Sequence, residues 1–158
     1  MSYGILTPGL VQEAYEMVYP LIEATLANRA KRQHLAIVVT ATSAILETDT
    51  NKSFQENCLF TASIGEEKKW EYEYDVIALS KAEKSARTGK GSAELAPHYL
   101  IDGDTIYWGS VVLDDIVVAC SGVEPYYDEL FSMWIASAIK ALAKKRFAEL
   151  SPDAMFIS

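Results

Sequence analysis

Residues 119–142, "ACSGVEPYYDELFSMWIASAIKAL", decide the fold because two apolar runs of different period meet there. The run that ends at the link, "IVVACS", is short and β-branched, as in a buried strand. After the link, Pro125 suits the first turn of a helix, and apolar residues then recur three and four positions apart until Pro152 forbids continuation. The stretch therefore predicts a strand that passes directly into an amphipathic helix.

The rest of the chain shows the same two periods. Thr7 before Pro8 predicts an N-cap, and helical spacing follows to about residue 29. A second helical pattern covers residues 67–88 and ends at Gly89. The runs that predict strands are "HLAIVVTAT" (34–42), "AILETDT" (44–50), "NCLFTASI" (57–64), "HYLI" (98–101), "TIYWGSVVL" (105–113) and "IVVACS" (116–121).

Turn signals connect the last three of these strands. Asp102-Gly103 is a strong hairpin signal and Asp114-Asp115 a weaker one. The element order α-β-β-(β)-α-β-β-β-α predicts an α+β fold, in which helices cover an antiparallel sheet of five to six strands. At 158 residues, the chain fits one domain, 1–158.

Composition narrows the classes of function. The net charge of −8 repels phosphate backbones and anionic lipids, so neither nucleic acid nor a membrane surface is expected as a partner. The sequence has no apolar run of about 20 residues and no signal-peptide pattern, so we expect a cytoplasmic protein. Cys58 and Cys120 lie far apart in apolar runs, which favours buried free thiols over a disulfide or a redox pair.

Three stretches carry a resemblance to a known family. "SGVEPYYDE" (121–129) is similar to the signature that follows the last strand in the GlcG/HbpS-like family of haem-binding and haem-degrading-domain-like proteins. "KAEKSARTGKGS" (81–92) is similar to that family's middle helix, and "LFTASIG" with Trp70 resembles one of its subgroups. The chain departs from the family at Thr40 and Ser43, where an Asp and a Gly are usual, and at Ala119, where a glycine is usual. The resemblance implies a divergent member with a profilin-like fold.

The resemblance also implies a ligand, haem or another tetrapyrrole. His98 is the candidate iron ligand, with Tyr99 beside it, because relatives carry their ligand loop in this region. Lys81, Lys84 and Arg87 lie three residues apart on one helical face and are candidate partners for the propionates. A surface or hydrogen-bonded histidine and a solvated, ion-paired helix face are the alternatives. With two histidines and no close Cys/His pair, no other metal site is expected.

Two functions follow from these observations. The first is a non-catalytic small-molecule binding protein, with haem as one candidate ligand. The second is an interaction or assembly protein whose pocket has degenerated, which the missing family glycines favour. The apolar face of the last helix is wide for packing on one sheet, so a homo-oligomer, a dimer or larger, is the expected partner state. An enzyme has the least support, because no local motif assembles a nucleophile, a base and an orienting group.

Overall fold

The computed structural model describes residues 4–157, and the outermost ends of the predicted domain, 1–3 and 158, lie outside them. The helices are α1 (Pro8–Asn28), α2 (Phe54–Asn57), α3 (Tyr74–Thr88) and α4 (Pro125–Ala148). The strands are β1 (Leu35–Ala41), β2 (Phe60–Ile64), β3 (Ser110–Leu113) and β4 (Ile116–Ser121). Three short 3₁₀ turns also occur, η1 (Glu67–Lys69), η2 (Ser92–Glu94) and η3 (Pro97–Tyr99).

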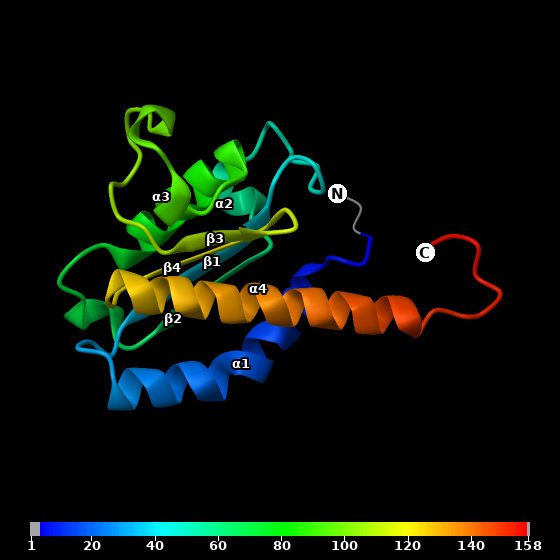
Figure 1. Cartoon of the computed structure of the whole chain (residues 1–158), viewed down its shortest axis with the longest axis horizontal. Coiled ribbons are helices and arrows are strands. Elements are labelled where there is room, and N and C mark those ends of the chain that lie inside the picture. The colour runs from blue at the N-terminus through cyan, green and yellow to red at the C-terminus, as the bar shows by residue number, and fades with distance from the viewer. Residues whose placement is uncertain (1–3, 158) are drawn as a thin grey trace.

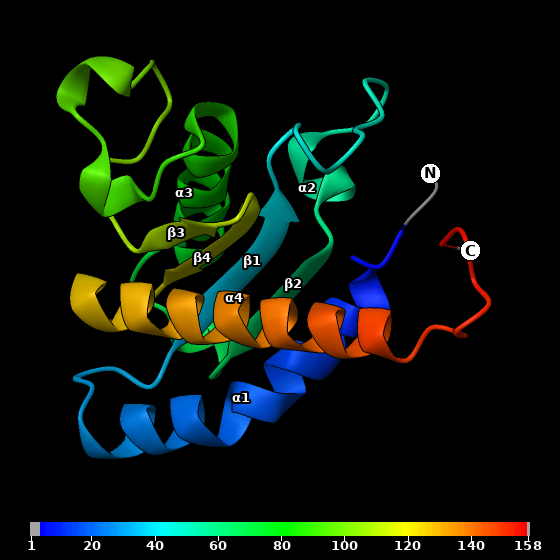
Figure 2. The same ribbon diagram turned by 45° about the vertical axis from the view of Figure 1, so that its right-hand side comes forward.

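The strands form one antiparallel sheet in the order β2-β1-β4-β3. Helices α1 and α4 lie side by side on one face of this sheet, and α3 lies on the opposite face (Figures 1 and 2). The result is a helix/sheet/helix sandwich with β1 and β4 at its centre. This confirms the predicted α+β class and the antiparallel sheet.

The central strands are buried on both faces, which explains their continuous apolar composition. Alternate residues of β1, including Leu35, Ile37 and Val39, join the core beneath α1 and α4. The residues between them, Ala36 and Val38, face α3 and join a smaller second core. Alanines dominate this second core, and small side chains let α3 approach the sheet closely.

The sheet of the described residues has four strands, so the prediction of five to six was too large. Residues 44–50 do not form a strand, because the amides of Ile45 and Leu46 turn back to the carbonyl of Thr42. Residues 98–101 do not form a strand either, because His98 and Tyr99 belong to the 3₁₀ turn η3, which begins at Pro97. Only Ser110–Leu113 of the predicted strand 105–113 pairs with β4.

Lys84 gives the physical reason for the shortened strand. Its ammonium nitrogen donates to the carbonyls of Thr105 and Tyr107, at 2.8 and 3.0 Å. Those carbonyls therefore point at a helix side chain and not along a strand ladder. Gly109, at φ +141°, then redirects the chain into β3.

Of the two predicted hairpin turns, only the one with the weaker sequence signal forms a hairpin. Asp114 and Asp115 both adopt positive φ, 47° and 67°, and form the tight β3–β4 hairpin. A primed turn needs positive φ at both central positions, and aspartate tolerates it. Asp102-Gly103 forms a turn inside a loop, without a strand on either side. The hairpin thus lies at the site that the sequence ranked second.

The strand-to-helix passage around residues 121–125 is as the sequence predicts. β4 ends at Ser121, and α4 begins four residues later with Pro125 in its first turn. Gly122 is required between them: its φ is +141°, and a Cβ there would overlap the backbone carbonyl of His34. The predicted Thr7 cap is also confirmed, since its hydroxyl accepts from the amide of Leu10 at 3.1 Å.

Candidate functional site

The larger of two described pockets lies beside the link between β4 and α4. Its volume is about 580 Å³, within the range of small-molecule sites. Helix α3 and the segment before it form one wall, and the β4–α4 link with the first turn of α4 forms another. The loop after α1 and Tyr107 of the loop before β3 contribute the rest. The lining residues are Lys31, Arg32, Glu71, Tyr72, Tyr74, Ile77, Lys81, Tyr107, Ser121, Gly122, Val123, Glu124, Pro125 and Asp128.

A buried ion pair forms part of this lining. The Lys81 ammonium lies 3.4 Å from Asp128 Oδ2 and donates to the carbonyl of Cys120 at 2.8 Å. The other carboxylate oxygen, Asp128 Oδ1, accepts from the backbone amide of Val123 at 3.3 Å. The side chains are only 1% and 3% exposed. The pair therefore joins α3 to the first turn of α4 across the end of β4.

Local sequence explains how a lysine reaches this position. Lys81 follows Ala78 and precedes Ala82, whose small side chains let α3 lie close to the sheet. Gly109 leaves room for the pair, because a Cβ there would lie 2.7 Å from Asp128 Cβ and 3.0 Å from Lys81 Nζ. A side chain at position 109 would displace one partner or the other.

Burial controls the ionisation of both partners. It raises the pKa of Asp128 to about 7, although the attraction of Lys81 opposes this. It also lowers the pKa of Lys81, against the opposing attraction of Asp128. Desolvation disfavours each charged form, as expected for carboxyl and ammonium groups removed from water. The pair thus carries a proton-sensitive charge within the pocket wall.

Two further polar atoms of the pocket are buried without a hydrogen-bond partner among residues 4–157. One is the hydroxyl of Tyr74, a residue that is 4% exposed, and the other is Glu124 Oε2. The second oxygen of that carboxylate, Glu124 Oε1, accepts from the backbone amide of Lys31 at 3.1 Å. Unpaired buried polar atoms are rare in native structures and call for an explanation.

The rest of the lining combines aromatic surface with paired and free charge. Tyr72 and Tyr107 are exposed tyrosines, 61% and 55% accessible. Arg32 lies 3.8 Å from Glu71, an exposed pair of small energetic value. Lys31 is among the lining residues, and its ammonium makes no ion pair in the described part of the chain. The pocket therefore offers both signs of charge beside aromatic surface.

The predicted site residues do not converge on this pocket. Lys81 lines it, but Lys84 is buried and donates to the carbonyls of the loop before β3. Arg87 pairs with Asp104 at 2.7 Å and also donates to the Tyr99 carbonyl. The two lysines are therefore not on a solvated helix face, which corrects the alternative considered for them.

His98 and Tyr99 lie apart from the pocket lining, with their rings stacked at 4.7 Å between centroids. The ammonium nitrogen of Lys90 lies 5.7 Å from the centre of the Tyr99 ring. The five predicted residues thus divide between one pocket residue, two structural cations and a stacked aromatic pair. They line no common cavity among those described.

Sequence reasoning missed Asp128, Tyr74 and Glu124 as pocket groups. Acidic residues in the first turn of a helix suggest solvated side chains that stabilise the positive end of the helix dipole, and Asp128 fits that interpretation from the sequence alone. That interpretation assumed a solvated first turn, whereas Asp128 is 2% exposed. The one signal in the sequence was the position of Lys81 on the same helical stripe as Ala78 and next to Ala82, where burial of a lysine requires an opposite charge nearby.

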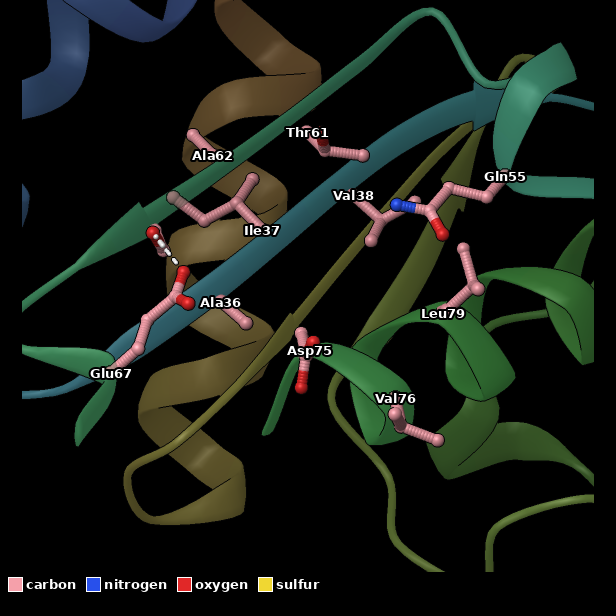
Figure 3. Close-up of a pocket in the computed structure, with 11 residues that line it drawn as sticks. Ala36, Ile37, Val38, Gln55, Thr61, Ala62, Glu67, Asp75, Val76 and Leu79 are labelled. Atoms are coloured by element: carbon pink, nitrogen blue, oxygen red, sulfur yellow. Dashed lines mark hydrogen bonds between the residues drawn. The ribbon is translucent and has the colours of Figure 1, made fainter. Parts of the chain in front are cut away.

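A second, smaller pocket of about 270 Å³ lies between β1, β2 and α3 (Figure 3). Asp75 and Leu79 of α3 and Thr61 of β2 line it, and Glu67 accepts a hydrogen bond from Ser63 there. The close-up shows the side chains that line it, and its charged lining residues, Glu67 and Asp75, are exposed. It is the weaker candidate site.

Two negative findings apply to residues 4–157. No group of three or more His, Cys, Asp or Glu side chains is arranged to hold a metal ion there. In the same range, no helix combines the length and the apolar character needed to cross a membrane. Both cysteines are free thiols; Cys120 is buried, as predicted, whereas Cys58 is only partly buried.

The fold and pocket define a class: an α+β sandwich with one antiparallel sheet and a cleft at the start of its last helix. No protein-family model and no curated protein matches the sequence. Among solved structures, Klebsiella pneumoniae protein ORFY, of family model DUF336, is similar at 16% identity and a TM-score of 0.56. The match covers 89% of this chain and 94% of that one.

The Ybr137w protein is also similar, with 16% identity, a TM-score of 0.49, and coverage of 84% of this chain and 77% of that one. DUF336 proteins are GlcG-like and have the profilin-like fold. The likeness to ORFY therefore supports the predicted fold. At this identity it carries no information about ligand or activity.

Proposed function

We propose that this chain is a non-catalytic small-molecule binding protein whose ligand occupies the pocket between α3 and the β4–α4 link. The observation that carries the proposal is the buried Tyr74 hydroxyl, which belongs to the pocket lining and has no partner among the described residues. Leaving such a group unpaired costs about 1–3 kcal/mol, which a bound ligand would recover. The adjoining Lys81–Asp128 pair adds desolvated charge to the same cavity.

A test of this proposal does not require the ligand to be identified in advance. Amide spectra of the ¹⁵N-labelled protein would be recorded with millimolar aromatic acids, amines, zwitterions and neutral compounds. At least one should shift the amides of Gly122, Val123 and Tyr74 saturably. Ile77→Trp, which fills the pocket from α3, should abolish the shifts, and Val76→Trp, an exposed neighbour that does not line it, should leave them.

Two results would count against the proposal. If no probe produces a saturable shift, the pocket is not a binding site for these classes of molecule. If the shifts survive Ile77→Trp, ligand binds elsewhere and the assigned pocket is wrong. Circular dichroism of both tryptophan variants checks that the fold is retained.

Haem, the ligand implied by the resemblance, is a separate question. Of the residue types that usually ligate haem iron, His, Cys, Met and Tyr, only tyrosine occurs in the lining, and His98 lies outside it. Haemin titration should be followed by the Soret band in the wild type, His98→Ala and Tyr74→Phe. Loss of a saturable shift in His98→Ala supports the predicted ligand, whereas loss in Tyr74→Phe places haem in the pocket. Absence of any saturable shift removes haem and leaves the pocket proposal intact.

The second candidate function, assembly with further copies of the chain, is favoured by exposed apolar residues. Met17 and Leu21 on α1 are 53% and 56% exposed, and Met155 and Phe156 near the C-terminus are 86% and 84% exposed. Large exposed apolar side chains mark interaction surfaces when they cluster. Sedimentation at micromolar concentration should show a dimer or larger, and Leu21→Glu should shift it toward monomer. A wild-type monomer would exclude this function.

A further inference from the structure

The unsatisfied atoms of the pocket specify the chemistry of its occupant, and this inference rests on the proposed binding function. Glu124 Oε2 is buried and has no partner within residues 4–157, so it can accept from a ligand N–H or O–H group. A carboxylate forms its strongest hydrogen bonds with charged donors. An ammonium group is therefore the best partner for this end of the pocket.

The remaining free groups are donors. Lys81 makes hydrogen bonds to two oxygens, which leaves one of its three N–H groups without a partner among the described residues. In the same part of the chain, the Tyr74 hydroxyl is unpartnered and the Lys31 ammonium makes no ion pair. These groups suit a ligand carboxylate.

Asp128 does not compete with Glu124 for a ligand cation. Its Oδ1 accepts from Val123 and its Oδ2 from Lys81, whereas Glu124 Oε2 has no partner among the described residues and is the more available acceptor. When Asp128 is ionised, the charged residues of the lining also balance, with Lys31, Arg32 and Lys81 against Glu71, Glu124 and Asp128. A ligand without net charge preserves that balance, and one with a single charge of either sign does not.

We propose that the pocket binds a small zwitterion of the α-amino-acid class with an aromatic or apolar side chain. Its ammonium group donates to Glu124 Oε2, and its carboxylate accepts from Lys81 and Tyr74. The side chain packs against the tyrosine rings and Ile77. This assignment gives a partner to both the carboxylate oxygen and the hydroxyl that lack one, and both belong to residues of one pocket lining.

Three probes that share the indole ring test the assignment. L-tryptophan carries both charged groups, 3-indolepropionate lacks the ammonium and tryptamine lacks the carboxylate. Titration of the amides of Gly122 and Val123 should give the tightest binding for L-tryptophan. Its affinity should exceed that of either analogue at least about tenfold, because each analogue forfeits one charge-assisted hydrogen bond and leaves its buried partner unpaired.

Variants separate the two ends of the ligand. Glu124→Gln should weaken L-tryptophan at least about tenfold while leaving 3-indolepropionate within about twofold, since only the ammonium contact is lost. Tyr74→Phe should weaken L-tryptophan and 3-indolepropionate together. Glu129→Gln, which removes the same charge from α4 five residues later and outside the lining, is the matched control and should change neither affinity.

The outcomes distinguish this inference from the function on which it rests. Equal or tighter binding of either analogue overturns the zwitterion assignment and leaves small-molecule binding standing. Unchanged discrimination in Glu124→Gln also overturns it, because the ammonium partner is then elsewhere. If none of the three probes binds but another compound of the wider panel does, the class is wrong and the pocket is right. If no compound binds at all, both proposals fail.

Discussion

The free energy of unfolding of the wild-type protein should fall between pH 5 and pH 8 as Asp128 ionises, and Asp128→Asn should abolish this fall. Asp128 is 2% exposed, and burial raises its pKa to about 7. In the unfolded chain, an aspartate has a pKa of about 3.9. The folded state therefore holds the proton more tightly, and between about pH 4 and pH 7 it binds more protons than the unfolded state. Under that condition, the free energy of unfolding falls as the pH rises.

The magnitude follows from the same shift. Each pH unit in this window costs about 1.4 kcal/mol, and the effect saturates near the folded pKa, so the loss between pH 5 and pH 8 is about 3 kcal/mol. The asparagine of the variant cannot titrate, yet its amide oxygen can still accept from the backbone amide of Val123. Lys81 acts in the opposite sense: burial lowers its pKa, so stability is regained as the pH rises toward 10.5. Because the measurements end at pH 8, the contribution of Lys81 to the measured change in stability is limited.

The assay is urea unfolding at half-unit pH steps for the wild type, Asp128→Asn and Asp102→Asn. Asp102 lies in an exposed turn and is the matched control. The wild type and the control should lose stability in parallel, and the Asp128→Asn curve should be flatter by about 3 kcal/mol over the range. Three parallel curves would refute the reasoning, because Asp128 would then titrate as it does in the unfolded chain.

Two further predictions concern the scaffold that holds the pocket. Phe131→Ala, at a fully buried position of α4, should lower the free energy of unfolding in urea by about 3–5 kcal/mol, and a loss below about 1 kcal/mol would mean that α4 is not seated on the core. Gly122→Ala should lower the free energy of unfolding by about 2 kcal/mol or more, because the added Cβ meets backbone atoms. Gly103 also has a positive φ, but a Cβ there meets open space, so Gly103→Ala should lower the midpoint of thermal unfolding less than Gly122→Ala does. Equal losses of stability in the two variants would show that the positive φ alone, and not the contact of the Cβ, causes the loss.

The elements that the sequence predicted well are those with a long and consistent period. The strand containing Ile37 and Val39 and the helix after Pro125 needed no tertiary information, because their apolar spacing fits one type of element. The short runs failed for a tertiary reason. Thr105 and Tyr107 have strand-like neighbours, yet their carbonyls are bound by a lysine 21 and 23 residues earlier in the chain. No local pattern contains that contact.

The candidate site was predicted less well than the fold, for a related reason. Helical spacing correctly places Lys81, Lys84 and Arg87 on neighbouring positions, but it does not say which face is covered. Both lysines are buried, and each then takes a different set of oxygens. Likewise, Asp128 follows a Ser-Gly link in a way that suits a solvated helix start, and only the position of α3 reveals it as a buried counter-ion.

The buried polar groups around the pocket separate the two candidate functions. An assembly protein needs the exposed apolar residues of α1 and the C-terminal segment, but it gains nothing from a desolvated ion pair at the start of α4. Replacing such a pair by apolar residues often leaves stability unchanged or improves it, so stability alone does not account for Lys81 and Asp128. Tyr74 and Glu124, whose unpartnered atoms add to this cost in stability, belong to the lining of the same cavity. Two further unpartnered buried atoms, His34 Nδ1 and Trp70 Nε1, belong to residues outside the lining. The ion pair and the other two unpartnered atoms belong to one pocket lining, and a binding site is where such violations of local folding rules are expected.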